Sequence, residues 1–505
     1  MTIPVAGRNI RPCSLKPSTR IILSTNLLFI TTDQQRWDSL PCYGLDFMQT
    51  PHLDRLAREG TVFDNCIVPS PVCVPCRAAI MSGQYPATTG VLGNGDWLQS
   101  DTPVWPEVIG RTRKTAAIGK MHFNPWDSLQ GFDERIMAED KRHIYLPDHH
   151  VQFLAGHGME RPHPTTLPGY YETLGASVTP RDRKFHVDGY VGDQAVAWLE
   201  KNGSEPFAAW VSFPGPHDPY DPPEDMAEMY ADAPIPEPVG SPEELARKPP
   251  AQRSRGSGSL SNSMFRLDLS RATTEHYMKW RQHYYANISL IDEGIGKMLK
   301  ALEDIGALDN TLIIFTSDHG DALGDHGLPF KGFFYDCMSR VPLIIRGPGV
   351  TAGQRASSLI STIDLVPLFY RTCDTDAPAT LQGEDVTPAL TDGTHSIRDH
   401  VFSEIGGRMM VRTQTHKYAH YSDASAELYD FVDDPDEITN RAGDAGYAAV
   451  EGELKSKLIE HTMACQANRK HAVSAPQYWL RNELEADYKQ QVETGGDSSY
   501  RPPHR

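Results

Sequence analysis

The chain has few cysteines and no long hydrophobic run. Only eight of its 505 residues are cysteine, too few for the disulfide framework of a small secreted protein. No apolar stretch approaches the roughly 20 residues that a membrane-spanning helix needs. Residues 1–20 are polar and basic, and no long apolar run follows them, so we find no signal peptide. We therefore expect a cytoplasmic protein that does not enter a membrane.

The chain also has fewer basic than acidic residues. The chain has 48 Lys and Arg against 66 Asp and Glu, a formal net charge of −18. This excess disfavours nonspecific binding to nucleic acid or to an anionic membrane surface, although a locally basic site can still bind a small anion. With 39% hydrophobic and 23% charged residues, the composition is that of an ordinary globular protein.

Four short apolar runs are typical of buried strands in a parallel sheet, at residues 26–33, 206–213, 311–318 and 341–346. A helix is predicted over 284–303, where Ile288, Ile291, Ile295, Leu299 and Leu302 are spaced three or four apart. Strands that alternate with helices predict an α/β fold, with a large, mostly parallel central sheet flanked by helices.

The predicted organisation has four parts. They are an N-terminal tail (1–20), a large α/β domain (21–395), a smaller C-terminal unit of antiparallel strands and a helix (396–466), and an extension (467–505). Residues 233–270 are rich in Pro, Ser and Gly and form an insertion. It is a lid over a site, an oligomer contact, or a loop without a role. The C-terminal extension could link subunits of a homo-oligomer.

Polar side chains follow two of the predicted strands. Asp33 ends the first strand and precedes Gln34, and Asp318 and His319 end another. In open α/β sheets, binding sites gather at the carboxyl ends of the strands. A single Asp there is more often a helix cap, but two carboxylates and an imidazole together can hold a divalent cation. Oxygen-rich sites favour calcium, magnesium or manganese.

Further basic groups flank these strand ends. Lys120 and His122 in "GKMHF" share one face if the segment is extended. His217 lies in a proline-rich loop just after a strand, and Lys331 follows the His319 segment. Each taken alone is more often a surface lysine or a structural histidine, and their shared position beside strand ends is what points to a site.

The segment "SPVCVPCR" (70–77) can be interpreted in two ways. Cys73 and Cys76 could form a redox or metal-binding pair, which requires a lowered thiol pKa that Arg77 and a helix N-terminus could provide. That interpretation leaves Asp33 and His217 unexplained. Alternatively, the same letters spell Cys-x-Pro-x-Arg, in which only Cys73 carries chemistry.

Four blocks carry a resemblance to a known family: "LLFITTDQQRWDSLPCYG" (27–44), "PSPVCVPCRAAIMSGQYPATTGV" (69–91), "IGKMHF" (118–123) and "FTSDHGDALGDHG" (315–327). With these, the chain resembles a type I, formylglycine-dependent sulfatase of the alkaline phosphatase superfamily. The "DQQ" and "SDHGD" forms are similar to the choline-sulfatase and phosphonate monoester hydrolase branch.

The resemblance implies that a formylglycine-generating enzyme converts Cys73 to 3-oxoalanine (formylglycine). One hydroxyl of the hydrated aldehyde, bound to a metal, would attack sulfur and release the alcohol. Deprotonation of the second hydroxyl would then expel sulfate from the covalent sulfo-enzyme. The implied function is a sulfuric ester hydrolase acting on a small aryl, choline or sugar sulfate.

The resemblance also implies a role for each residue. One divalent cation, first of all Ca²⁺ with Mn²⁺ or Mg²⁺ as alternatives, would be bound by Asp33, residue 73, Asp318 and His319. Gln34 is either a weak ligand or only a neighbour. Arg77 would steady the hydroxyls, and Lys120 and Lys331 would neutralise the sulfuryl oxygens. His122 would be the base for the second hydroxyl, His217 would protonate the leaving alkoxide, and Asn94 would line the substrate side.

Two other functions stay open for the same residues. A phosphonate monoester or phosphodiester hydrolase could use the same site, because the anions have similar shapes; the presence of both Lys120 and His122 favours the sulfatase. A catalytically silent relative is expected if Cys73 is never converted.

Overall fold

The computed structural model describes residues 25–142, 146–163, 167–256, 267–470 and 473–474. Its core is a nine-stranded sheet with the order β10-β2-β9-β7-β1-β6-β4-β5, in which β8 pairs with β2. The strands are β1 (Asn26–Asp33), β2 (Thr61–Ile67), β4 (Lys114–Gly119), β5 (Glu134–Met137), β6 (Phe207–Pro216), β7 (Thr311–Ser317), β8 (Arg340–Val341), β9 (Leu343–Arg346) and β10 (Gln354–Ser361). The hydrophobic β1 lies in the middle, between β6 and β7.

The sheet is mostly parallel, as predicted, but the run 341–346 was wrongly assigned to a parallel strand. It divides between β8 and β9, and β9 runs antiparallel to both β2 and β7. A strand buried on both faces is apolar whichever way it points, so its residue pattern carries no information on direction.

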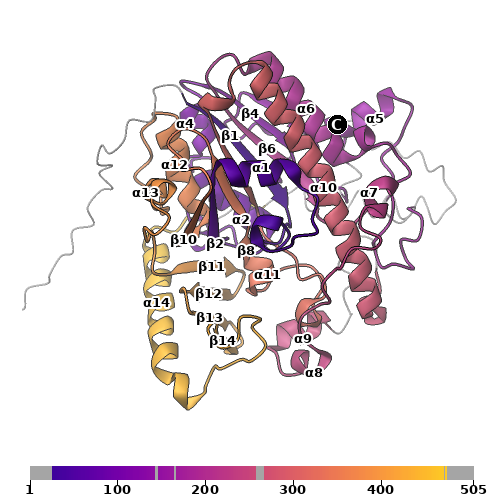
Figure 1. The fold of residues 1–505 in the computed structure, drawn as a ribbon. Coiled ribbons are helices and arrows are strands. Elements are labelled where there is room, and N and C mark those ends of the chain that lie inside the picture. The colour runs from indigo at the N-terminus through magenta and orange to yellow at the C-terminus, as the bar shows by residue number, and fades with distance from the viewer. Residues whose placement is uncertain (1–24, 143–145, 164–166, 257–266, 471–472, 475–505) are drawn as a thin grey trace, which may run out of the picture.

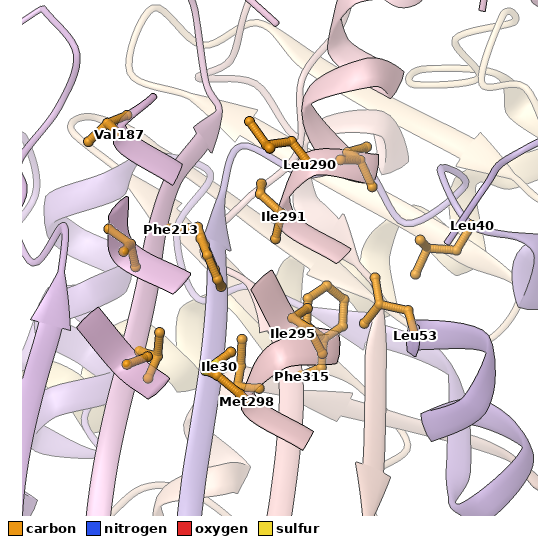
Figure 2. Packing of buried hydrophobic residues seen from close by; sticks show 14 of the residues in the cluster. Ile30, Leu40, Leu53, Val187, Phe213, Leu290, Ile291, Ile295, Met298 and Phe315 are labelled. Atoms are coloured by element: carbon orange, nitrogen blue, oxygen red, sulfur yellow. The ribbon is translucent and has the colours of Figure 1, made fainter. Parts of the chain in front are cut away.

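Helices cover both faces of the sheet (Figure 1). One face packs against α1 (Pro51–Glu59), α6 (Val187–Asn202) and α10 (Thr274–Asp304), and the other against α2 (Cys73–Ser82), α4 (Trp105–Ile109) and α12 (Leu365–Thr372). Figure 2 shows Ile30, Phe213 and Phe315 of the strands beside Ile291, Ile295 and Met298 of α10, which buries the predicted apolar stripe.

The α10 helix extends beyond its predicted start because Thr273 and His276 form a capping box at its N-terminus. Shorter elements connect the layers: α3 (Pro86–Thr89), β3 (Asp96–Trp97), α5 (His149–Gly156), α7 (Glu224–Glu228), α11 (Asp336–Ser339), α13 (Thr387–Thr391) and β15 (Val473–Ser474). Among the described residues, no helix is both long and apolar enough to cross a membrane.

A second, antiparallel sheet lies beside the first (Figure 1). It contains β11 (Val401–Ile405), β12 (Arg408–Arg412), β13 (His416–Tyr421) and β14 (Ala426–Asp430), and α14 (Ala448–Ala467) packs against it. The predicted fold class, a large mostly parallel sheet with a smaller antiparallel one, is confirmed. The division of the chain between residues 395 and 396 is retained as a proposal.

The insertion is anchored to the small sheet. It contributes α8 (Pro242–Leu245) and α9 (Pro250–Gly256). Lys248 lies between these two helices, and its Nζ donates to the Tyr429 hydroxyl at 2.8 Å. Gln252 lies in α9, and its Nε2 donates to Glu427 at 2.7 Å. Residues 257–266 of the insertion, the tail 1–20 and residues 475–505 of the extension lie outside the described residues.

Candidate active site

The predicted site residues gather at one edge of the central sheet. Thr32 of β1 is in register with Ser317 of β7, and Gly119 of β4 is in register with Ser212 of β6. Asp33, Lys120, His217 and Asp318 therefore emerge side by side at the carboxyl ends of four neighbouring parallel strands. All four are buried.

The backbone turns sharply at these strand ends. Gln34 has φ of 73° and His122 has φ of 57°, both in the left-handed region that non-glycine residues rarely adopt. Gly119 has φ of 98°, and a Cβ there would meet the Ser212 carbonyl oxygen at 2.0 Å. The "GKMHF" segment is thus irregular after β4, with a bend at His122, and the assumption of an extended segment for Lys120 and His122 does not hold.

Cys73 lies at the first residue of α2, in the middle of the site. Its Sγ is 3.0 Å from Lys331 Nζ, 3.2 Å from His319 Nε2 and 3.8 Å from Asp33 Oδ1. Asn94 Oδ1 accepts a hydrogen bond from the Val74 backbone N–H at 3.1 Å, so this side chain holds the start of α2. The structure thus places Asn94 next to Cys73 with its amide oxygen already in use.

The thiols do not have the acidity of a redox pair. Burial and the Asp33 charge raise the pKa of Cys73 to about 11, and burial raises the pKa of Cys76 well above its ordinary value. A reactive dithiol needs a lowered pKa, and the cysteines within the described ranges are all unpaired. The redox interpretation of "SPVCVPCR" therefore loses its physical basis.

Arg77 joins the two carboxylates of the site. Its guanidinium donates from Nε to Asp318 Oδ2 at 2.9 Å and from Nη2 to Asp33 Oδ2 at 3.1 Å. Nη1 donates to the Lys120 carbonyl at 2.6 Å and to Ser212 Oγ at 2.8 Å. This fully buried side chain ties the ends of four strands together.

Four donor groups are arranged to hold a cation. Ligand atoms of Asp33, Cys73, Asp318 and His319 all lie within 4.8 Å of one another. His319 Nδ1 bonds to the Gly320 carbonyl at 2.9 Å, which leaves Nε2 as the atom that faces the cluster. Burial and Lys331 hold the pKa of His319 well below its ordinary value, so its imidazole is in the neutral form that binds metals.

Gln34 supplies an oriented oxygen beside this set. Its Nε2 donates to Asp321 Oδ2 at 2.5 Å, and Asp321 Oδ2 also accepts from the Tyr220 hydroxyl at 2.7 Å. The opposite atom, Gln34 Oε1, is buried without a hydrogen-bond partner among the described residues. An orphaned buried acceptor is costly, and a cation bound next to Asp33 would satisfy it.

The two carboxylates respond differently to their surroundings. Burial alone would raise both pKa values, but Lys120 and Lys331 hold the pKa of Asp33 well below its ordinary value. Burial and the neighbouring Asp33 charge instead raise the pKa of Asp318 to about 6. A divalent cation between them would relieve this repulsion, so the donor set fits a hard divalent metal ion.

The sequence analysis missed Asp140, which lies at the junction of the basic groups. Its Oδ2 is 2.9 Å from Lys120 Nζ, 3.8 Å from His122 Nε2 and 3.9 Å from His217 Nε2. Arg142 binds the same carboxylate through Nε at 3.0 Å and Nη2 at 2.8 Å. The sequence did contain a sign of this residue, because the segment "ERIMAED" (134–140) also ends in acidic residues. Its strand, β5, is short and half polar.

His217 is held between Asp140, Arg142 and the metal ligands. Its Nδ1 bonds to the Asp218 carbonyl at 2.7 Å, and its Nε2 is 2.9 Å from Arg142 Nη2 and 3.9 Å from Asp33 Oδ1. Burial, Arg142 and Lys331 hold its pKa well below the ordinary value. Nδ1 therefore carries the proton, and Nε2 presents its lone pair to the site.

Access to the cluster is on the side of Lys331 and Arg142. Their side chains are 12% and 21% exposed, whereas those of Asp33, Arg77 and Lys120 have no exposure. Four cations, Arg77, Lys120, Arg142 and Lys331, face four carboxylates, Asp33, Asp140, Asp218 and Asp318. A bound divalent cation would thus give the site its positive charge surplus.

We expect Gln34→Ala to weaken binding of Ca²⁺ by about 10-fold or more, because outer and weak ligands contribute on this scale. Isothermal titration of the metal-free protein measures this without turnover. Gln35→Ala is the matched control, since that neighbouring buried amide donates to Ser39 Oγ at 3.1 Å. Equal calcium affinity in Gln34→Ala and the parent protein would exclude Gln34 as a ligand.

Comparison with known families covers almost the whole described chain. A family model described as Sulfatase matches residues 25–374. A second, described as N-sulphoglucosamine sulphohydrolase, C-terminal, matches residues 324–464. The first match contains every strand of the central sheet, and the second contains the small antiparallel sheet.

Individual relatives include two kinds of ester hydrolase. The chain is 32% identical to a choline-sulfatase of Rhizobium meliloti (strain 1021), over 83% of this chain and 82% of the relative. It is 26% identical to an N-acetylglucosamine-6-O-sulfatase of Bacteroides thetaiotaomicron, over 92% and 90%. The solved phosphonate monoester hydrolase of Agrobacterium radiobacter superposes with a TM-score of 0.76 at 26% identity, over 89% of this chain and 99% of that one.

Proposed function

Since the chain belongs to the sulfatase family of the alkaline phosphatase superfamily and is a sulfuric ester hydrolase, we propose that it cleaves sulfate monoesters with a formylglycine made from Cys73. The observation that carries the proposal is the position of the Cys73 Sγ, 3.2 Å from His319 Nε2 and 3.0 Å from Lys331 Nζ. A nucleophile at this position would face both the cation site and an ammonium group.

The conversion of Cys73 would take place before the chain folds. The side chain is fully buried at the start of α2, so an oxidising enzyme can reach it only while the segment is extended. The mature aldehyde, as its hydrate, would supply one hydroxyl to attack sulfur and a second whose deprotonation releases sulfate. The required partner is a formylglycine-generating enzyme.

Asp33, Asp318, His319 and the modified residue 73 would hold one divalent cation, with Gln34 as a weaker ligand and Ca²⁺ favoured by the oxygen-rich donor set. When bound, the cation lowers the pKa of the attacking hydroxyl and polarises the sulfuryl group. Arg77 would keep both carboxylates in place through its two hydrogen bonds to them. Lys120 and Lys331 would neutralise the sulfuryl oxygens as negative charge develops.

The two histidines would move protons on opposite sides of the reaction. Once substrate displaces the hydrogen bond from Arg142, His217 would take up a proton from solvent at Nε2 and pass it to the leaving alkoxide. His122 would accept the proton of the second hydroxyl. Asp140, within 4 Å of Nε2 of both rings, would stabilise each imidazolium as it forms.

A phosphonate monoester or phosphodiester hydrolase is the second candidate, supported by the similarity to the Agrobacterium radiobacter enzyme. The combination of Lys120 and His122 beside Asp140 favours sulfate, because it adds a cation and a base at the position of the sulfuryl group. The physiological alcohol is proposed to be an aryl, choline or sugar alcohol, following the names of the relatives.

Two measurements test the proposed function. Peptide mass spectrometry across residues 64–77 should find Cys73 with its CH₂SH group replaced by an aldehyde. A substrate panel of aryl sulfates, choline sulfate, sulfated sugars and phosphonate monoesters should then show the highest kcat/KM for a sulfate. An active enzyme with only unmodified Cys73 would refute the mechanism. A faster turnover of phosphonates than of every sulfate would establish the second candidate.

A further inference from the structure

Two charged side chains lie beside His217 on the open side of the active site. Arg142 Nη2 is 2.9 Å from His217 Nε2, and Asp218 directly follows His217 in the chain. The side chains of Arg142 and Asp218 are 21% and 11% exposed, whereas that of His217 is 1% exposed. Since the leaving alkoxide would take its proton from His217 Nε2, the rest of the alcohol has to lie against Arg142 and Asp218.

Arg142 and Asp218 form an open ion pair. Arg142 Nη1 is 3.6 Å from Asp218 Oδ2, which is too far for a hydrogen bond. Nε and Nη2 of the same guanidinium bind Asp140 at 3.0 and 2.8 Å, so its position is fixed. Within the described ranges, neither Arg142 Nη1 nor Asp218 Oδ2 makes a hydrogen bond. The pair therefore presents one unused donor and one unused acceptor side by side.

A neighbouring ion pair shows that the same two segments can also form a closed contact. Lys141 Nζ is 2.7 Å from Asp221 Oδ1 and donates to the Pro219 carbonyl at 2.8 Å. Lys141 directly precedes Arg142, and Asp221 comes three residues after Asp218. The Lys141 pair is thus satisfied within the protein, whereas Arg142 and Asp218 are held apart and leave room for a ligand group between them.

A hydroxyl group is the ligand that suits this gap. It can accept from Arg142 Nη1 and donate to Asp218 Oδ2 at the same time, which neither a carboxylate nor an ammonium group can do. A second anionic group on the alcohol would be repelled by Asp218, and a quaternary ammonium would meet the nearer charge of Arg142. A plain alkyl or aryl group would displace water from both charged groups without replacing its hydrogen bonds, which is costly.

We propose that Arg142 and Asp218 select alcohols with a free hydroxyl next to the sulfate ester, as in the ring of a sulfated sugar. The inference rests on the proposed function, because it takes His217 as the group beside the leaving oxygen. The ester oxygen then lies at His217 Nε2, and the neighbouring hydroxyl lies between Arg142 Nη1 and Asp218 Oδ2. Sulfated sugars are thereby preferred to choline sulfate and to simple aryl sulfates.

The test compares two substrates that differ by one hydroxyl, the monosulfate of a vicinal cyclohexanediol and cyclohexyl sulfate. The measured quantity is the ratio of their kcat/KM values, and its change between variants cancels the intrinsic reactivity of the two esters. We expect the parent enzyme to prefer the diol ester. Asp218→Ala and Arg142→Met should each lower the ratio by about 10-fold or more, the scale of one hydrogen bond to a charged group.

Asp221→Asn is the matched control, because it alters the closed ion pair with Lys141 in the same loop. It should leave the ratio unchanged even where both kcat/KM values fall. Equal turnover of the two esters by the parent, or an unchanged ratio in folded Asp218→Ala or folded Arg142→Met, would overturn the inference.

Hydrolysis of phenyl sulfate by the parent tests the proposed function separately. If the parent cleaves phenyl sulfate and the substitutions at Arg142 and Asp218 do not change the ratio, only the inference about the hydroxyl fails. If the parent cleaves no sulfate ester, the proposed function fails and the inference fails with it.

Discussion

Replacing Cys73 by alanine is expected to lower kcat/KM for a sulfate ester by at least about 10⁴-fold, the scale on which enzymes depend on their nucleophile. The alanine variant removes one donor of the cation site but keeps Asp33, Asp318 and His319. Calcium affinity by titration should therefore change far less than activity. Steady-state kinetics on the best substrate of the panel measures the effect.

Cys73→Ser separates nucleophilic attack from product release. A serine hydroxyl can take the sulfuryl group, but it lacks the second hydroxyl whose deprotonation would expel sulfate. The expected result is a burst of about one equivalent of alcohol per active site followed by negligible turnover. Intact mass should show the sulfated enzyme. Steady turnover at a rate close to that of the parent would contradict the role of the aldehyde.

Cys76→Ser is the matched control for both variants. Cys76 is fully buried three residues after Cys73 and packs in the apolar core on the α2 side of the sheet. Because no step of the proposed reaction uses it, kcat should stay within a few-fold of the parent. A loss of activity comparable with that of Cys73→Ala in a folded Cys76→Ser protein would instead restore the dithiol interpretation.

The sequence predicts the part of the site that lies at the ends of strands. Hydrophobic runs place Asp33 and Asp318 at the carboxyl ends of parallel strands, and parallel strands bring such ends to one edge. The sequence could not predict that Arg77 donates to both carboxylates. That contact depends on how α2 packs against the sheet, and the role expected for Arg77 toward the formylglycine hydroxyls stays a prediction.

Two details of the sheet, the direction of β9 and the presence of β5, could not be predicted from the pattern of residues. The direction of β9 depends on the connection through β8 and Pro342, because the apolar side chains of Leu343, Ile344 and Ile345 would suit either direction. The strand β5 has four residues and only one of them is buried, which is too weak a periodicity to identify. Asp140, which follows β5, was missed for that reason.

Asp140→Asn is expected to lower kcat by about 10²- to 10³-fold, the range seen when one preorganised electrostatic group is removed. The carboxylate neutralises Lys120 and Arg142 and lies beside Nε2 of His122 and His217. An amide of the same shape keeps the packing but removes the charge that stabilises an imidazolium. Among the described residues Asp140 is linked to the cation ligand Asp33 only through Lys120 and His217 and contacts no ligand directly, so KM should change much less than kcat.

The pH dependence distinguishes this effect from simple loss of structure. Burial, Arg142 and Lys331 lower the pKa of His217, and the negative charge of Asp140 opposes them. Removing that charge lowers the pKa further, so the limb of the kcat profile that reports loss of the His217 proton should move to lower pH. Asp140→Glu should restore part of the activity and of the profile. Asp148→Asn is the control, because this buried carboxylate is paired with Arg161. It should lower stability but leave this limb of the kcat profile at its original pH. If the limb of Asp140→Asn also stays at its original pH, Asp140 does not act through His217.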